Sequence, residues 1–375
     1  MTWKKKVKKS TEKHDKINDE KLQYTLIEPF SSQLTQLLVA AKSKKNRYAK
    51  QIILVEGKRL IKEALKAKIQ PVMILFSRKH LIEDLPLDPH YTSAETTILR
   101  KLKYSHIKLW SDLTTSPGIF GIFKMPNLEK NQRIIDPLPI TMVCDNIREP
   151  GNLGSILRVA AAIPVQKVIL LAGFECQDID LKCCTDLWDS KVIRGSSGAL
   201  FYLTIQSNAS WEDVKDTCHD NVIIADHIPA SSSKNGIIPV EMYNNSNEIE
   251  ESVVHSDDEN NEIKFEKDIR EIYQLPVISC YDFKCRKDQS YVIIIGGETC
   301  GLSEECFEFA ASRNGYRVYI PLSECVNNLN SATALGVHHT ISLCVFYAVA
   351  YEWTIVDVEK NVDSFLRICG EYSRL

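Results

Sequence analysis

The chain has 375 residues, which suits two modest domains with tails better than a single domain. Hydrophobic residues make up 44% and charged residues 25%, as in ordinary globular proteins, and no apolar run reaches the roughly 18 residues that span a bilayer. A membrane-spanning protein is therefore excluded. The net charge of −3 is uneven, because residues 241–271 carry eleven acidic and three basic side chains. The rest of the chain is net basic, which is compatible with RNA binding.

The twelve cysteines are scattered and include no C-x-x-C pair, and no secretory hydrophobic segment opens the chain. These features argue against a disulfide framework and an oxidising compartment. Cys280 and Cys285 lack a second pair with the spacing of a zinc site, so no metal is expected. Most of the cysteines are interpreted as small buried hydrophobes.

The first half of the chain predicts a tail and a compact α/β domain. Residues 1–25 are lysine-rich and polar, which predicts a disordered basic tail. Residues 28–125 then alternate between helical and strand-like patterns, which defines the first domain. Its predicted elements are a helix over 33–48, a strand over 51–55, an amphipathic helix over 58–68, and strands over 72–76 and 118–123.

Residues 126–139 are proline-rich and predict a linker, and a second α/β domain follows over 140–355, with a tail at 356–375. Its near-continuous apolar strands, separated by helices, indicate a parallel sheet covered on both faces. An acidic, Asn/Ser-rich stretch at about 230–285 is predicted to be a disordered insertion. The predicted strands cover 140–144, 167–171, 221–225, 291–295 and 317–320.

Three polar segments each follow a predicted strand, at the edge where open parallel sheets bind ligands. The first is 145–158, with the sequence DNIREPGNLGSILR, in which Asn152 can cap a helix that runs on through Arg158. The two residues are six apart, so both can point near one cleft. A plain strand-turn-helix with an exposed arginine is the alternative.

The other two segments are 295–302 (IGGETCGL) and 320–330 (IPLSECVNNLN). Glycines let the backbone approach a ligand closely, and Glu298 adds a carboxylate at the same turn. The spacing fits neither a phosphate loop nor a dinucleotide fingerprint. Asparagines at a strand-helix junction can bind a ligand's polar edges or act as ordinary caps.

In this order and spacing, the three segments resemble the motifs of the SpoU (TrmH-like) branch of the SPOUT RNA methyltransferases. The segment 194–199 (RGSSGA) fits the family's sequence between the first two motifs, and VEGKRL (55–60) and SPGI (116–119) resemble its small RNA-binding domain. The resemblance implies an L30-like α/β substrate-binding domain, followed by a parallel-sheet domain with a deep trefoil knot. It also implies a homodimer that methylates ribose 2′-hydroxyls with S-adenosyl-L-methionine.

Residue by residue, the resemblance implies roles for two groups of positions. Arg158 is implied as the family's catalytic arginine, yet a guanidinium stays protonated at neutral pH, so its role is interpreted as electrostatic stabilisation with an RNA phosphate sharing the proton. The catalytic set is Asn152, Arg158, Glu298, Asn328 and Asn330, and the cofactor-binding set is Gly296, Gly297, Gly301, Ile320, Leu322 and Leu329.

One position departs from the family, because Asn328 stands where the third motif ordinarily has serine. The substitution leaves open a non-catalytic RNA-binding assembly factor, and a tRNA methyltransferase is the other alternative. Within the family, the resemblance is strongest to the mitochondrial large-subunit rRNA guanosine-2′-O-methyltransferases. Large-subunit rRNA is therefore the expected substrate and the mitochondrion the expected location. Because the lysine-rich start contains acids, unlike a typical transit peptide, a cytoplasmic location is the alternative.

Overall fold

The computed structural model describes residues 23–27, 31–92, 97–131, 134, 137–172, 184–218, 220–226, 275–283, 286, 289–297, 301–322, 329–330 and 332–336. Its contacts divide the chain into two compact units. Unit 1 comprises Met1–Arg133, Leu153–Ala161 and Thr185–Leu203, and unit 2 comprises Ile134–Asn152, Ala162–Cys184 and Thr204–Leu375. The division differs from the sequence-based domains, because two later segments group with the N-terminal residues.

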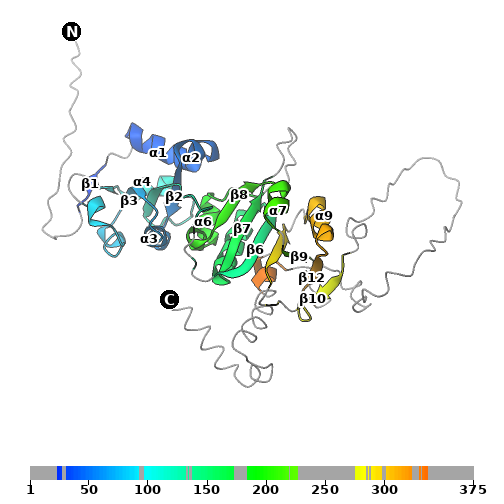
Figure 1. Ribbon diagram of the computed structural model, residues 1–375. Coiled ribbons are helices and arrows are strands. Elements are labelled where there is room, and N and C mark those ends of the chain that lie inside the picture. Colours follow the sequence, from blue (N-terminus) through cyan, green and yellow to red (C-terminus); the bar gives the residue numbers. More distant parts are fainter. Residues whose placement is uncertain are drawn as a thin grey trace, which may run out of the picture. The chain divides into compact units, whose positions relative to one another are not determined.

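Unit 1 is built around a five-stranded mixed sheet in the order β1-β4-β3-β5-β2 (Figure 1). β5 is antiparallel to both β2 and β3, whereas β4 is parallel to β3 and β1. Apolar residues of α1, β2 and β5 form a buried core. The bounds are β1 (Thr25–Leu26), α1 (Ser32–Lys42), α2 (Lys44–Lys50), β2 (Ile52–Glu56), α3 (Lys58–Lys66), β3 (Pro71–Phe76), β4 (Leu99–Lys101), α4 (Tyr104–Trp110), β5 (Ile119–Lys124) and α6 (Ser190–Gly195), with 3-10 turns at Lys79–Leu81, Pro89–Thr92 and Ala199–Tyr202.

The single helix predicted over 33–48 is wrong, because the structure has two helices there. The backbone of Ser43 is extended, with φ −89° and ψ 125°, and this ends α1 before α2 begins. Arg47 then turns back, and its NH1 group donates to the carbonyls of Ala41 (3.0 Å) and Lys42 (3.2 Å). These bonds satisfy two carbonyls that the end of α1 leaves without helical partners.

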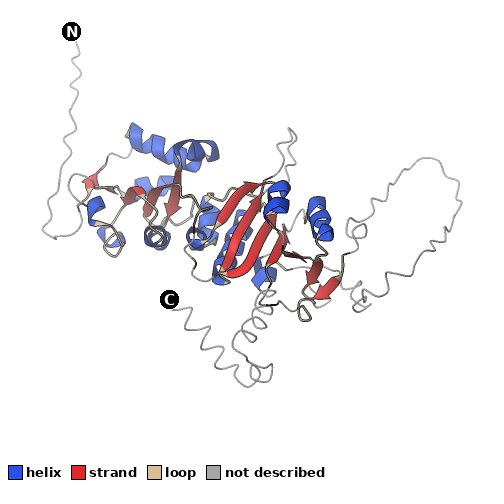
Figure 2. Cartoon of the chain, viewed as in Figure 1, coloured by secondary structure: helices blue, strands red, loops and turns tan. Residues whose placement is uncertain are grey.

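Unit 2 contains a seven-stranded sheet in the order β10-β12-β9-β11-β6-β7-β8, and every pairing is parallel (Figure 2). β11 is buried along Tyr291–Ile295, as expected for a central strand covered on both faces. The bounds are β6 (Leu138–Asp145), β7 (Val165–Leu171), β8 (Ile205–Ala209), α7 (Trp211–Thr217), β9 (Asn221–Ala225), β10 (Val277–Ser279), β11 (Tyr291–Gly296), α9 (Glu304–Ser312) and β12 (Tyr316–Tyr319).

The sheet order places a topological switch point between β6 and β11. From β6 the chain proceeds outward to β7 and β8 on one side, whereas β9, β12 and β10 lie beyond β11 on the other. Open α/β sheets bind ligands at the carboxyl ends of strands where the order reverses in this way. The helix α5 (Pro150–Ala162) follows β6 directly, and its first turn belongs to unit 2 while Leu153–Ala161 belongs to unit 1.

Two details of the sequence-based layout need correction. β6 begins at Leu138, inside the predicted linker, and Val277–Ser279 forms the edge strand β10 inside the stretch predicted as a disordered insertion. Residues 227–274, the tail at 356–375 and most of the basic tail lie outside the described residues. The trefoil knot stays a prediction. Among the described residues, no helix is long and apolar enough to cross a membrane.

Deleting residues 231–272 should leave the thermal unfolding midpoint unchanged, because this acidic stretch offers little apolar surface to bury. A deletion of residues 231–285 should lower the midpoint, because it also removes β10 and leaves β12 without its outer parallel partner. Circular dichroism melts of the two proteins would test this. Equal midpoints would show that β10 contributes nothing to stability.

Candidate functional site

The carboxyl ends of β6 and β11 lie side by side, where Asp145 and Gly296 are paired across the sheet. Just beyond them, the N–H of Gly297 donates to the carbonyl of Asp145 (3.0 Å). The N–H of Gly301 in turn donates to the carbonyl of Gly297 (2.9 Å). The first and second motifs are therefore joined at one edge of the sheet, as the sequence predicts.

Glycine is required in this turn because backbone approaches backbone too closely for a side chain. A Cβ on Gly297 would lie 2.1 Å from the carbonyl oxygen of Asn146, and one on Gly296 would lie 2.9 Å from the carbonyl carbon of Gly301. Gly301 has φ +63°, in the left-handed region that glycine adopts without strain. The glycines that the sequence assigns to cofactor binding are thus the residues that shape the turn.

Asp145 ties the first motif to the second, and the sequence analysis did not select it. Its side chain is buried, and its Oδ2 accepts from the N–H of Ser303 (2.7 Å), at the start of α9. The Nε1 of Trp211, on α7, donates to the Oγ of Ser303 (3.2 Å). A buried carboxylate that accepts a backbone N–H fixes the far side of the glycine turn. The sequence signal that could have revealed Asp145 is its position, as an aspartate at the end of a continuous apolar strand.

The asparagines of the first and third motifs are in direct contact. The Nδ2 of Asn330 donates to the Oδ1 of Asn152 (2.7 Å), and the Oδ1 of Asn330 accepts from the N–H of Ala332 (3.1 Å). Asn330 therefore begins the next helical segment while it contacts α5. Asn152 does not have the predicted N-cap position, because α5 begins two residues earlier, at Pro150.

The remaining predicted site residues fall into three groups. Arg158 is exposed on α5, six residues after Asn152. Ile320 and Leu322 are half-buried just after β12, and Leu329 is half-buried beside Asn330 in sequence. Glu298 and Asn328 lie outside the described residues, so their assignments stay predictions.

Asn146, directly after β6, has unusual surroundings. Asn146 has a left-handed backbone (φ +55°) and is 2% exposed, and its Oδ1 has no hydrogen-bond partner among the residues that the structure describes. A buried acceptor without a partner is costly, and a ligand donor would relieve that cost.

Burial raises the pKa of the neighbouring Cys144 thiol and of the Cys306 thiol on α9. In the described part of the chain, no three His, Cys, Asp or Glu side chains cluster closely enough to hold a metal ion.

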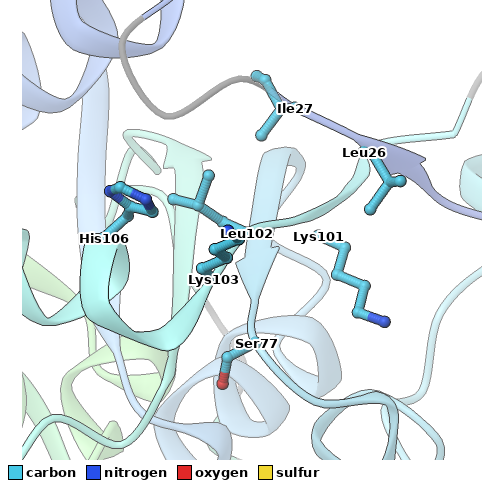
Figure 3. A pocket seen from close by; sticks show the side chains of 7 residues that line it. All are labelled: Leu26, Ile27, Ser77, Lys101, Leu102, Lys103 and His106. Carbon is cyan, nitrogen blue, oxygen red and sulfur yellow. The ribbon is translucent and has the colours of Figure 1, made fainter. Parts of the chain in front are cut away.

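Unit 1 contains a basic pocket of its own, of about 350 Å³. In Figure 3, Lys101 and His106 lie on opposite sides of it, with Leu102 and Lys103 between them. The Nζ of Lys101 lies 5.6 Å from the centroid of the Tyr24 ring, and the Nζ of Lys79 lies 5.9 Å from the same centroid. The pocket thus combines basic side chains with apolar ones, and one of its lysines also lies near an aromatic ring.

Both halves of the chain match known protein families. Residues 139–339 match the SpoU rRNA Methylase family, and residues 35–121 match the MRM3-like substrate binding domain. The chain belongs to the SpoU rRNA methylase family. It is therefore an RNA methyltransferase.

Named relatives and solved structures agree with this family. The chain is 34% identical to "rRNA methyltransferase 3, mitochondrial" of Homo sapiens over 84% of its length and 73% of the relative's. It is 33% identical to "rRNA methyltransferase 3A, mitochondrial" of Danio rerio, over 82% and 67% of the two lengths. The SpoU methyltransferase AviRb of Streptomyces viridochromogenes, solved with AdoMet, matches with a TM-score of 0.56, 18% identity, and coverage of 84% and 97%. This last likeness confirms the SPOUT fold of a SpoU methylase.

Gly297→Ala should weaken S-adenosylmethionine binding by at least about tenfold, because the new Cβ would overlap the Asn146 carbonyl and displace the turn. Gly151→Ala is the matched control, since a Cβ there meets nothing within 4 Å. Calorimetric titration of both variants measures the affinities. Equal affinities for the two variants would show that the turn does not form the cofactor pocket.

Proposed function

We propose that this SpoU methylase transfers a methyl group to the ribose 2′-hydroxyl of a guanosine in mitochondrial large-subunit rRNA. The proposal is supported by relatives named as mitochondrial rRNA methyltransferases. It is also supported by a 24% identical relative from Bacillus subtilis, which is named "23S rRNA (guanosine(2553)-2'-O)-methyltransferase RlmP". The protein acts in mitochondria. The relatives favour this enzyme over a tRNA methyltransferase or a non-catalytic assembly factor.

The ends of β6 and β11 fit S-adenosylmethionine. Gly296 and Gly297 allow close backbone approach at the end of β11, and the buried Oδ1 of Asn146 is an acceptor that a ligand's N–H groups would satisfy. Gly296, Gly297, Gly301, Ile320, Leu322 and Leu329 would hold the cofactor, largely through their main chain. The bound cofactor supplies an electrophilic methyl group on a sulfonium. Asp145 supports the residues around the glycine turn because its carboxylate accepts a hydrogen bond from the N–H of Ser303.

The protein's own task is to make a ribose hydroxyl nucleophilic, because a neutral hydroxyl is a weak nucleophile. Arg158 is exposed on α5 and so is open to RNA. Its guanidinium stabilises the alkoxide that forms as the hydroxyl loses its proton, and an RNA phosphate beside it accepts that proton. The hydrogen bond between Asn330 and Asn152 fixes the first turn of the helix that carries Arg158. Glu298 and Asn328 are proposed to complete the catalytic set, and a homodimer to complete the RNA site.

Arg158→Ala should abolish methyl transfer and leave S-adenosylmethionine affinity within about twofold. The reason is that the exposed side chain is proposed to stabilise the reacting hydroxyl and not to bind the cofactor. Transfer of a labelled methyl group to large-subunit rRNA fragments measures activity, and calorimetry measures affinity. Arg313→Ala is the control, because it removes an arginine at the carboxyl end of α9, outside the proposed catalytic set. Substantial activity in Arg158→Ala would overturn the assignment. Absence of turnover in the unmodified protein, with cofactor bound, would favour the assembly factor.

The pocket of unit 1 is proposed to bind the RNA substrate. Lysine ammonium groups neutralise phosphates, and an aromatic ring beside them suits the stacking of an unpaired base. Lys101 and Lys103 approach the pocket from the end of β4 and the residue before α4. This pocket lies within the domain that matches a substrate-binding family.

Replacing both Lys101 and Lys103 by Gln should weaken RNA binding and lower the salt dependence of the affinity, by a slope of about 0.7 for each lost phosphate contact. Lys44→Gln with Lys45→Gln is the matched control, because it removes the same charge from the exposed helix α2 of the same unit. Filter binding across a salt series measures both quantities. An identical slope for the two double variants would argue against this pocket as an RNA site.

A further inference from the structure

The segment 185–203 lies between β7 and β8 in sequence, yet it forms part of unit 1 together with the substrate-binding domain. Polar side chains join the two. The Nδ2 of Asn131 donates to the carbonyls of Phe201 (3.0 Å) and Leu203 (2.9 Å), and the hydroxyl of Tyr202 donates to Glu63 (3.1 Å). The methyltransferase sequence is thus anchored on the domain that precedes it.

The first buried group in this anchor is centred on Asp186. Its carboxylate forms an ion pair with Arg47, and the two side chains are only 9% and 7% exposed. The hydroxyl of Tyr48 also donates to Asp186 (2.8 Å). Burial, reinforced by the charge of Asp186, raises the pKa of Tyr48. Two neighbouring residues of α2 thus hold one carboxylate of the methyltransferase segment.

The second buried group joins two sequence motifs, VEGKRL and RGSSGA, that contribute no residue to the proposed catalytic site. Glu56, from VEGKRL, is 2% exposed in its side chain, and its Oε2 lies 3.9 Å from NH1 of Arg194, from RGSSGA. The other carboxylate oxygen accepts from the hydroxyl of Ser111. A buried carboxylate opposite an arginine is strongly destabilised when its partner is removed, so the pair fixes which surfaces meet.

Helix α6, which carries Arg194, is packed without clearance against α5. A Cβ on Gly154 would lie 2.7 Å from the carbonyl oxygen of Val192 and 2.8 Å from the Cα of Gly195. Gly154 and Arg158 are four residues apart on α5, so they lie on the same side of that helix, one turn apart. At this backbone-to-backbone contact, α6 cannot shift without displacing α5.

We propose that Glu56–Arg194 and Arg47–Asp186 are positioning pairs, which hold α6, and through it the helix carrying Arg158, in fixed register with the substrate-binding domain. RNA bound by that domain is then presented to Arg158 at one defined distance. Displacement of a reacting group by about 1 Å can cost on the order of 100-fold in rate. The pairs therefore act on turnover rather than on binding. This inference rests on the proposed role of Arg158.

The experiment uses the full chain with Glu56→Gln, Arg194→Gln and the double variant, and Asp186→Asn as a second, independent break. Glu56→Gln and Asp186→Asn keep the side-chain shape and remove the charge, whereas Arg194→Gln removes the charge and shortens the side chain. Thermal melts verify that each protein is folded. Glu308→Gln is the control, because it removes one carboxylate from an exposed ion pair with Lys215 in unit 2. Methyl transfer to rRNA fragments gives kcat and KM, while calorimetry and filter binding give the affinities for S-adenosylmethionine and RNA.

The single variants should lower kcat by about tenfold or more, with both affinities within about twofold of the unmodified protein. The double variant should lose no more than the worse single variant, because the two residues act as one pair. Unchanged kcat in the folded variants, or a loss that follows cofactor affinity, would overturn the proposal, and so would additive losses. Failure of Arg158→Ala to lose activity would instead overturn the catalytic assignment, so the two ideas are tested separately.

Discussion

The site depends on one close contact between backbones, where the turn after β11 passes over the end of β6. Gly297 and Asn146 approach so closely that no Cβ fits between them, and Asn146 itself has a left-handed backbone. Both features follow from placing β11 beside β6 although about 145 residues separate the two strands in sequence. The parallel register sets Asp145 opposite Gly296 and makes their strands end together. All the other groups of the site are placed relative to this contact.

The third motif reaches the same place from a distant strand. β12 is separated from β6 by β9 and β11, yet Asn330, eleven residues after the end of β12, donates to Asn152. Adjacent strands lie about 4.8 Å apart, so the separation is roughly 14 Å. A contact across that span joins parts of the sheet that strand pairing alone would leave independent. The proposed cofactor pocket can therefore be assembled from three segments while the sheet between them remains unbroken.

Much of this arrangement could be predicted from the sequence, because its signals are local. The apolar runs that became β3, β5, β9 and β11 were predicted within a residue or two, and the motif order indicated the family. The prediction failed where local pattern and tertiary structure disagree. The helix pattern at 33–48 continues through Ser43, but Arg47 folds back and donates to the carbonyls at the end of α1. β10 has only three residues and gains its stability from β12, so no local periodicity reveals it.

The residues that the sequence analysis missed share one property, which is that their partners are far away along the chain. Asp145 bonds to Ser303 and Arg47 to Asp186, separations of 158 and 139 residues. A single sequence gives no signal for such pairs, whereas a buried charge in the structure requires a partner and so reveals it. Burying an ion pair gains little net stability, and a hydrophobic pair of similar volume would serve stability as well. What a buried charge supplies is a penalty for every other alignment, because a shift that parts the charges leaves both without a partner. An enzyme that must hold a large RNA and a small cofactor at one reacting distance needs that kind of specificity in its framework.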